Sequence, residues 1–153
     1  MRRFVNSLWH DFLRPLFVRP DFVQVAAFCW RMNQEQREIL LVTSSNNNWI
    51  IPKGWPINGL DGAEAALTEA WEEAGVTADR PEVTFLGKYH SQKEMWEGVL
   101  VDARTHVYAI PVTTLSDDYP EVNERDRQWA RLSDAADMVN DQNLAAFLRS
   151  QIS

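Results

Sequence analysis

The stretch from Gly54 to Val76 constrains the fold more than any other part of the chain, because it contains no lysine or arginine and carries the sequence signals of a helix start and a helix end. Asp61 is followed three residues later by Glu64, which is a capping-box pattern, and Gly75 fits the glycine that ends a helix. The residues between them predict one apolar face, formed by Ala66, Leu67, Ala70, Trp71 and Ala74. We therefore expect an amphipathic helix here that packs on a core.

One flank of this helix carries three carboxylates, Glu69, Glu72 and Glu73, at the i, i+3 and i+4 spacing that brings side chains together. Like charges at that spacing destabilise a helix, and the last helical turn disfavours negative charge. The sequence offers no lysine or arginine one turn away to relieve them. A divalent cation would do so, because Mg²⁺ prefers carboxylate oxygens and is commonly shared with a substrate phosphate. The alternative is a solvated acidic face.

Strands are predicted on both sides of the helix. Before it, residues 22–31 are β-rich and mostly apolar, as a strand buried on both faces would be, and residues 37–43 are its hairpin partner. Residues 49–51 predict a short strand, and the prolines and glycines of 52–62 predict a loop. After it we expect strands over 83–89, 99–101, 105–112 and 128–132, with 99–101 and 105–112 forming a hairpin, and helices over 133–139 and 141–152 capped by Ser133 and Asp141. This order indicates an α+β fold with a mixed sheet.

The composition is that of one globular domain, since 45% of the 153 residues are hydrophobic and 24% are charged. A formal net charge of −7 argues against a general nucleic-acid binder, so we expect no nucleic-acid partner. The single cysteine, Cys29, cannot form an internal disulfide, and no apolar run reaches the roughly 18 residues of a membrane span. The N-terminus also lacks the apolar core of a signal peptide. We expect a cytoplasmic protein.

Residues 1–20 differ from the domain over 21–153 that follows them. Apolar residues recur at helical spacing from Phe4 to Phe17, and Pro15 predicts a break or kink. A basic amphipathic segment of this kind can lie on a membrane surface or dock on a partner. We favour a segment that packs on its own domain, without membrane contact.

The acidic stretch resembles the Nudix box, whose pattern is G-x5-E-x7-R-E-U-x-E-E-x-G-U with U an aliphatic residue. The residues that match at the required spacing are Gly54, Glu69, Ala70, Glu72, Glu73, Gly75 and Val76. Two positions depart from the pattern, because Leu60 stands where the family has glutamate and Thr68 where it has arginine. The flanking segments WIIPKGWP, QVAAFCWR, GKY and YPE…R…W are similar to the branch that includes diphosphoinositol polyphosphate and diadenosine polyphosphate hydrolases.

The resemblance implies a Nudix α/β/α sandwich, with the mixed sheet between helices, and a Mg²⁺-dependent pyrophosphohydrolase in which Mn²⁺ can substitute. The implied substrate is a metabolite with a diphosphate linkage, with a dinucleoside polyphosphate or a diphosphoinositol polyphosphate favoured. Carried over to this chain, Glu69 and Glu73 would be metal ligands and Glu72 the base for the attacking water. Family members divide these roles differently, so Glu69 as base and Glu72 as ligand stay open. The backbone carbonyl of Lys53 or Gly54 would complete the metal site.

Cations near the box are candidates for holding a polyphosphate. Lys53 directly precedes Gly54 and would contact a phosphate as a point charge. Lys88 and His90 share one face of a predicted strand, and with Arg31 and Lys93 they would form a cationic wall; the alternative is ordinary surface charge. Glu121 and Glu124 precede the last predicted strand, where some Nudix enzymes supply an extra metal ligand or base, so both are further candidates for that role.

The two departures from the box exchange an oppositely charged pair for two neutral residues, so neither change leaves an unpaired ion. We interpret Leu60 and Thr68 as a joint replacement that preserves activity. The alternative is a catalytically silent Nudix-fold module that senses a nucleotide or docks a protein.

Overall fold

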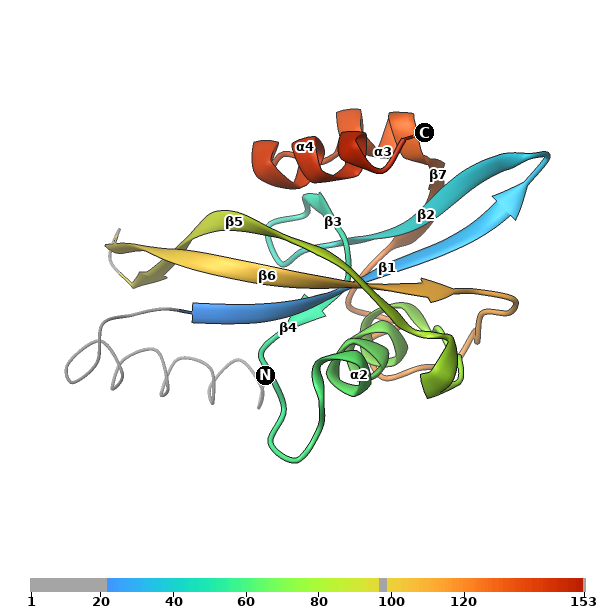
Figure 1. Cartoon of the computed structure of the whole chain (residues 1–153), viewed down its shortest axis with the longest axis horizontal. Helices are drawn as coiled ribbons and strands as arrows, with labels where there is room; N and C mark the ends of the chain where they lie inside the picture. Colours follow the sequence, from blue (N-terminus) through green and yellow to red (C-terminus); the bar gives the residue numbers. More distant parts are fainter. Residues whose placement is uncertain (1–21, 97–98, 153) are drawn as a thin grey trace.

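The computed structural model describes residues 22–96 and 99–152, and over residues 91–101 it describes the backbone alone. The described residues form one mixed β-sheet with helices on both of its faces (Figure 1). The strands are β1 (Phe22–Asn33), β2 (Gln36–Thr43), β3 (Trp49–Ile50), β4 (Lys53–Gly54), β5 (Thr84–Trp96), β6 (Val99–Pro111) and β7 (Arg127–Arg131). The helices are α2 (Gly62–Ala74), the 3-10 turn η1 (Arg80–Glu82), α3 (Leu132–Met138) and α4 (Gln142–Ser150).

The strand order is β3-β2-β1-β6-β5, with β4 paired to β1 and β7 paired to β2. β1 runs parallel to β6, whereas the other pairs of strands are antiparallel. β1 is long enough for its two halves to meet different partners on one edge: Val25 and Ala26 pair with β4, and residues 30–33 pair with β2. The sheet is therefore mixed, and the predicted α+β sandwich is confirmed.

Two cores lie on opposite faces of the sheet, one under α2 and one under α3 and α4 (Figure 1). Alternate residues of β1 serve both, because Ala27 and Cys29 pack with α2 while Ala26 and Phe28 pack with α3 and α4. The predicted burial of this strand on both faces is confirmed. Burial, with a further effect of the Glu73 charge, raises the pKa of the Cys29 thiol, so this side chain acts as core filler.

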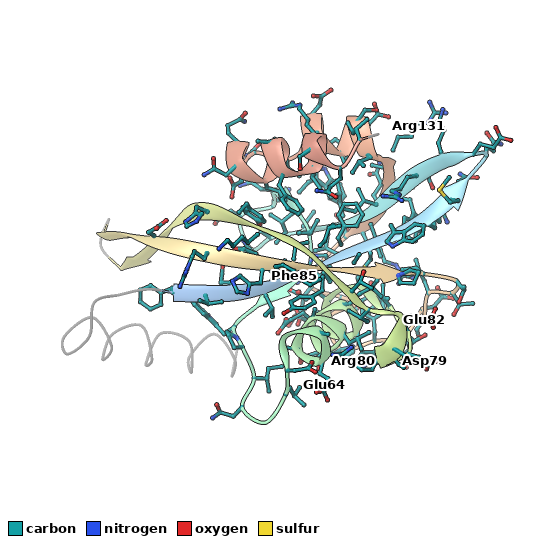
Figure 2. The ribbon with its side chains drawn as sticks, in the orientation of Figure 1. Glu64, Asp79, Arg80, Glu82, Phe85 and Arg131 are labelled. Atoms are coloured by element: carbon teal, nitrogen blue, oxygen red, sulfur yellow. The ribbon has the colours of Figure 1, made fainter. Side chains whose placement is uncertain are left out.

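The ends of α2 match their sequence signals. The N–H of Glu64 donates to Oδ1 of Asp61 at 2.8 Å, and the N–H of Asp61 donates to Oε1 of Glu64 at 3.2 Å, which completes the capping box. Gly75 ends the helix in the left-handed region with φ 71°. Arg80 adds an ion pair of 2.8 Å to Asp61, and Figure 2 labels Arg80 and Glu64 beside the start of α2. The hydrogen bond from Arg80, then that from the Glu64 backbone, lowers the pKa of Asp61.

Three local predictions need correction. The hairpin of 99–101 with 105–112 is wrong, since β6 is continuous and pairs with β5; its exposed Asp102 alternates with buried Ala103 instead of marking a turn. Ser133 is not the cap of α3, because the helix begins at Leu132, directly after β7, without a side-chain cap bond. The predicted loop over 52–62 contains the short strand β4.

The predicted N-terminal segment, residues 1–20, lies outside the described residues, and its packing stays a prediction. Within the described ranges, no helix combines the length and the apolar character needed to cross a bilayer.

Candidate active site

The glutamates of the α2 flank are mostly buried rather than solvated. Glu69 and Glu73 expose 0% and 2% of their surface, while Glu72 is half-buried. The solvated acidic face considered above therefore does not apply to Glu69 and Glu73. A buried carboxylate needs a counter-charge or hydrogen bonds. Without them, the removal of the charge from water costs roughly several kcal/mol per ion.

Glu69 lies directly against the backbone of β4. A Cβ added to Gly54 would lie 2.7 Å from Oε2 of Glu69 and nearer still to Oε1, which is too close for any side chain. Gly54 is fixed in this place because it pairs with Val25 of β1. The glycine that opens the box is thus required by the close approach of a carboxylate to the main chain, and not by an unusual backbone angle.

Among the described residues, Glu73 contacts a backbone donor and a guanidinium from different elements. The N–H of Lys53 donates to Oε2 at 2.9 Å, and Nη2 of Arg125 lies 3.0 Å from Oε1. The same guanidinium uses Nε to contact Glu121 at 2.8 Å and Nη1 to donate to the carbonyl of Thr43 at 2.8 Å. Arg125 thus provides the counter-charge that no lysine or arginine within α2 supplies.

The segment before β7 also satisfies the C-terminal end of α2. The N–H of Glu121 donates to the carbonyl of Glu72 at 2.9 Å, and Nη1 of Arg127 donates to the carbonyl of Ala74 at 2.7 Å. Donors and positive charge at a helix C-terminus are favourable, because the last carbonyls have no partner within the helix. The acidic last turn is therefore stabilised by residues about fifty positions further along the chain; Glu121 was a predicted site candidate in another role, and Arg127 was not predicted.

The donor types of this region suit a hard divalent cation. Carboxylates of Glu69 and Glu73 lie one helical turn apart, with Cβ atoms about 5–6 Å apart at that spacing, beside the backbone of Lys53 and Gly54. Oxygen donors of this kind are those that Mg²⁺ and Mn²⁺ prefer. Over the described residues, no three His, Cys, Asp or Glu side chains form a ready group for a metal. The residues fit the ion chemically, and Glu73 faces Arg125.

The Lys53 side chain points to the opposite face of the sheet from Gly54. It pairs with Ala26, which belongs to the core under α3 and α4, and paired residues share a face. Burial lowers the pKa of Lys53, and the charges of Asp141 and then Glu73 partly offset this. Lys53 thus reaches toward α4 with its side chain and toward Glu73 with its backbone.

Of the residues of the predicted cationic wall, Lys88 and His90 share one face of β5. Across the sheet, Lys88 of β5 pairs with His106 of β6, His106 pairs with Val25 of β1, and Val25 pairs with Gly54 of β4. Three strand spacings, about 14 Å in all, therefore separate Lys88 from Gly54 on the α2 face. His90 shares that face, is exposed, and lies 3.5 Å from an Asp102 oxygen.

Arg31 is not brought to this wall. It lies six residues along β1 from Val25, about 20 Å away at strand spacing. Its Nε contacts Glu38 at 2.7 Å, and its guanidinium lies 4.2 Å from the centre of the Trp129 ring. Lys93 belongs to β5, but its side chain lies outside the described ones.

The two departures from the box are locally satisfied. Leu60 is 38% exposed, and its N–H donates to the carbonyl of Ile57 in a turn. Thr68 donates its hydroxyl to the carbonyl of Glu64 at 3.0 Å, within its own helix. Neither neutral residue leaves a buried charge unpaired.

An open polar pocket shares Arg125 with the network around Glu73. It has a volume of about 270 Å³, and Arg125 is part of its wall. Hydroxyl and amide side chains dominate the rest of the lining, including Thr43, Ser44, Ser45 and Asn47. Two acidic residues, Glu124 and Asp126, complete the polar part of the lining, which can hydrogen-bond a polar ligand.

The fold, the cluster of α2 glutamates and the close approach of Glu69 to Gly54 together define a Nudix domain. The family model described as NUDIX domain matches residues 23–151. The chain belongs to the Nudix family. It is 34% identical over 116 residues to human diphosphoinositol polyphosphate phosphohydrolase 2, a match that covers 73% of this chain and 59% of that protein. The mouse protein of the same name matches equally. The chain therefore spans less than two thirds of the length of these curated relatives.

Solved structures agree on the fold. Ap4A hydrolase of C. elegans superimposes with a TM-score of 0.61 at 20% identity, covering 85% of this chain and 95% of that chain. The NUDIX domain of Shewanella oneidensis NrtR, complexed with ADP ribose, gives 0.61 at 18% identity, covering 91% and 93%. At these identities the likeness establishes the architecture alone.

Proposed function

We propose that this protein is a Mg²⁺-dependent pyrophosphohydrolase that cleaves a diphosphate linkage in a small polyphosphorylated metabolite, in the cytoplasm. The observation that carries the proposal is the burial of Glu69 and Glu73 beside the backbone of β4, because carboxylate oxygens one helical turn apart next to main-chain carbonyls are a donor set that suits Mg²⁺. The curated relatives named as phosphohydrolases support it.

In this proposal each box residue has a separate task. Glu69 and Glu73 would hold the cation with the carbonyl of Lys53 or Gly54, and a cation held there would supply charge neutralisation for the phosphate. Glu72, which is half-buried at the end of α2, takes the proton of the attacking water. The water oxygen forms a bond to phosphorus, and the bridging oxygen leaves with the electron pair of the broken anhydride bond.

Two substrate classes are favoured, dinucleoside polyphosphates and diphosphoinositol polyphosphates. The curated relatives carry the second name, and a structural neighbour carries the name Ap4A hydrolase. On the α2 face, Lys88 and His90 would hold phosphates far from the cation. Lys53 would contribute only its backbone there, because its side chain lies on the opposite face of the sheet. The polar pocket beside Arg125 would take an uncharged part of the ligand.

The test is phosphate release from a panel of both substrate classes, with and without Mg²⁺. We expect metal-dependent hydrolysis of at least one class, and a loss of about 10²–10⁴-fold in Glu72→Gln, the size typical of a lost general base. Glu82→Gln is the matched control, since it removes the same charge from an exposed position on η1 (Figure 2). Equal activity of both variants would refute Glu72 as the base.

The alternative function is a silent Nudix-fold module that binds a nucleotide or a protein. Leu60 and Thr68 favour it, because the family pattern has charged residues there. Binding of panel compounds without any metal-dependent phosphate release would establish this alternative.

A further inference from the structure

Arg125 is the centre of a closed network around one proposed metal ligand. All three guanidinium nitrogens have partners, which are Glu73 at 3.0 Å, Glu121 at 2.8 Å and the carbonyl of Thr43 at 2.8 Å. The Arg125 side chain is 20% exposed and that of Glu73 only 2%. Partly buried charges at this distance attract each other more strongly than surface charges, because water and salt screen them less.

Both oxygens of Glu73 are engaged in this network. Oε2 accepts the N–H of Lys53, and Oε1 faces Arg125. Throughout the described part of the chain, no three potential metal-binding side chains are gathered into a group. The metal-free protein therefore neutralises Glu73 with an arginine, at the carboxylate where the proposed function requires a divalent cation.

We propose that Arg125 is the resident counter-ion of Glu73, and that a divalent cation binds by displacing it. This inference rests on the metal-dependent function proposed above. A guanidinium and a divalent cation repel each other when they share one carboxylate oxygen, so binding of one weakens binding of the other. Arg125 is a positioning residue in this scheme: it stabilises the metal-free site and sets the metal concentration at which the site fills.

The network is built to allow this exchange. After leaving Oε1 of Glu73, the guanidinium keeps Glu121 and the carbonyl of Thr43 as partners. The charge is therefore not left alone when the ion pair opens, and Arg125 remains beside the site in the wall of the polar pocket. A purely structural arginine would stabilise the fold without opposing the metal.

Arg127 provides the comparison, because it belongs to the same segment and also contacts the end of α2. Its donors reach the carbonyls of Ala74 and Ser116 and an oxygen of Asp117, and none of these is a box glutamate. Removing either arginine removes one positive charge and some stability. Of these two arginines, only Arg125 contacts a proposed metal ligand.

The experiment titrates Mn²⁺ into the full chain, with the electron paramagnetic resonance signal of free Mn²⁺ as the readout, and measures the melting temperature with and without Mn²⁺. Arg125→Gln is expected to melt lower without metal and to bind Mn²⁺ about tenfold more tightly or better, with a larger melting shift on metal addition. Arg127→Gln is expected to melt lower as well, with a dissociation constant within about twofold of the parent.

Arg125→Lys keeps the positive charge but loses the planar set of guanidinium donors. This variant also tests the inference if Arg125→Gln does not fold. Its dissociation constant for Mn²⁺ is expected to stay within about threefold of the parent, with partial loss of stability. Unchanged or weaker Mn²⁺ binding in Arg125→Gln, or equal tightening in both glutamine variants, overturns the inference. No Mn²⁺ binding by the parent protein overturns the proposed metal site itself, and the inference with it.

Discussion

Substitution of Gly54 by alanine tests the contact on which the geometry of the site depends. The added methyl group would lie 2.7 Å from Oε2 of Glu69, and that side chain is 0% exposed, so the carboxylate cannot move aside into solvent. Overpacking of this kind costs about 1–3 kcal/mol. Displacement of a reacting or ligating group by about 1 Å costs roughly 10²-fold in rate, and we expect that loss in phosphate release.

Gly59→Ala is the matched control. Gly59 has φ 84° and no atom within 4 Å of an added Cβ. Alanine at this position would therefore have a strained backbone conformation but no steric clash. A left-handed alanine costs roughly 1–2 kcal/mol, which is close to the cost expected at Gly54. The two variants should therefore lose similar stability, and only Gly54→Ala should lose activity.

The assay combines urea unfolding of the metal-free proteins with phosphate release over a Mg²⁺ series. Gly54→Ala is expected to need more Mg²⁺ for half-activity, because Glu69 is a proposed ligand. Parent-like activity and Mg²⁺ dependence in Gly54→Ala would refute the reasoning that the approach of Glu69 to β4 forms the site. Equal activity losses in both variants would assign the effect to stability alone.

Four further outcomes are expected. Glu73→Gln should lose about 10²–10⁴-fold in activity and, because its guanidinium partner loses an ion pair, about 1–3 kcal/mol of metal-free stability in urea unfolding. Deleting residues 1–18 should lower the melting temperature; unchanged melting with strong sedimentation of the intact chain on anionic liposomes would contradict this. Asp61→Asn should melt lower at neutral pH: the pKa of Asp61 is depressed, so its contribution exists above the ordinary aspartate pKa and should vanish in melting curves as pH falls through the lowered value. Leu60→Glu with Thr68→Arg should keep or raise activity, with a coupling of about 0.5–3 kcal/mol in a double-mutant cycle, whereas additive single effects would mean the positions are independent.

The parts of the fold that could be predicted from sequence are those with local causes. The capping box at Asp61 and the glycine stop at Gly75 each depend on residues within one turn, so α2 was predicted with its ends. The burial of β1 on both faces follows from a mostly apolar run over 22–31. The spacing of Glu69 and Glu73 on one helix flank likewise follows from the helical period alone.

What could not be predicted depends on contacts between distant segments. β4 is two residues long and exists because β1 offers free edge positions at Val25 and Ala26, which no local pattern encodes. The continuity of β6 depends on its pairing with β5 along nearly its whole length. Arg125 reaches Glu73 across about fifty residues of sequence, and an indirect signal was available: an acidic helix without cations of its own needs them from elsewhere if it is buried.

The origin of that counter-charge links the sheet to the site. β7 pairs with β2 in a register that places Arg127 opposite Val42, and this pairing fixes where the chain just before β7 passes α2. The N–H of Asp126 donates to Oγ1 of Thr43, and Arg125 donates to the carbonyl of the same residue, so the end of β2 anchors the arginine directly. A slip of β7 by one residue would turn its side chains to the other face and withdraw the guanidinium from Glu73. Strand register, rather than the helix sequence alone, therefore makes the buried carboxylate of Glu73 tolerable in this fold.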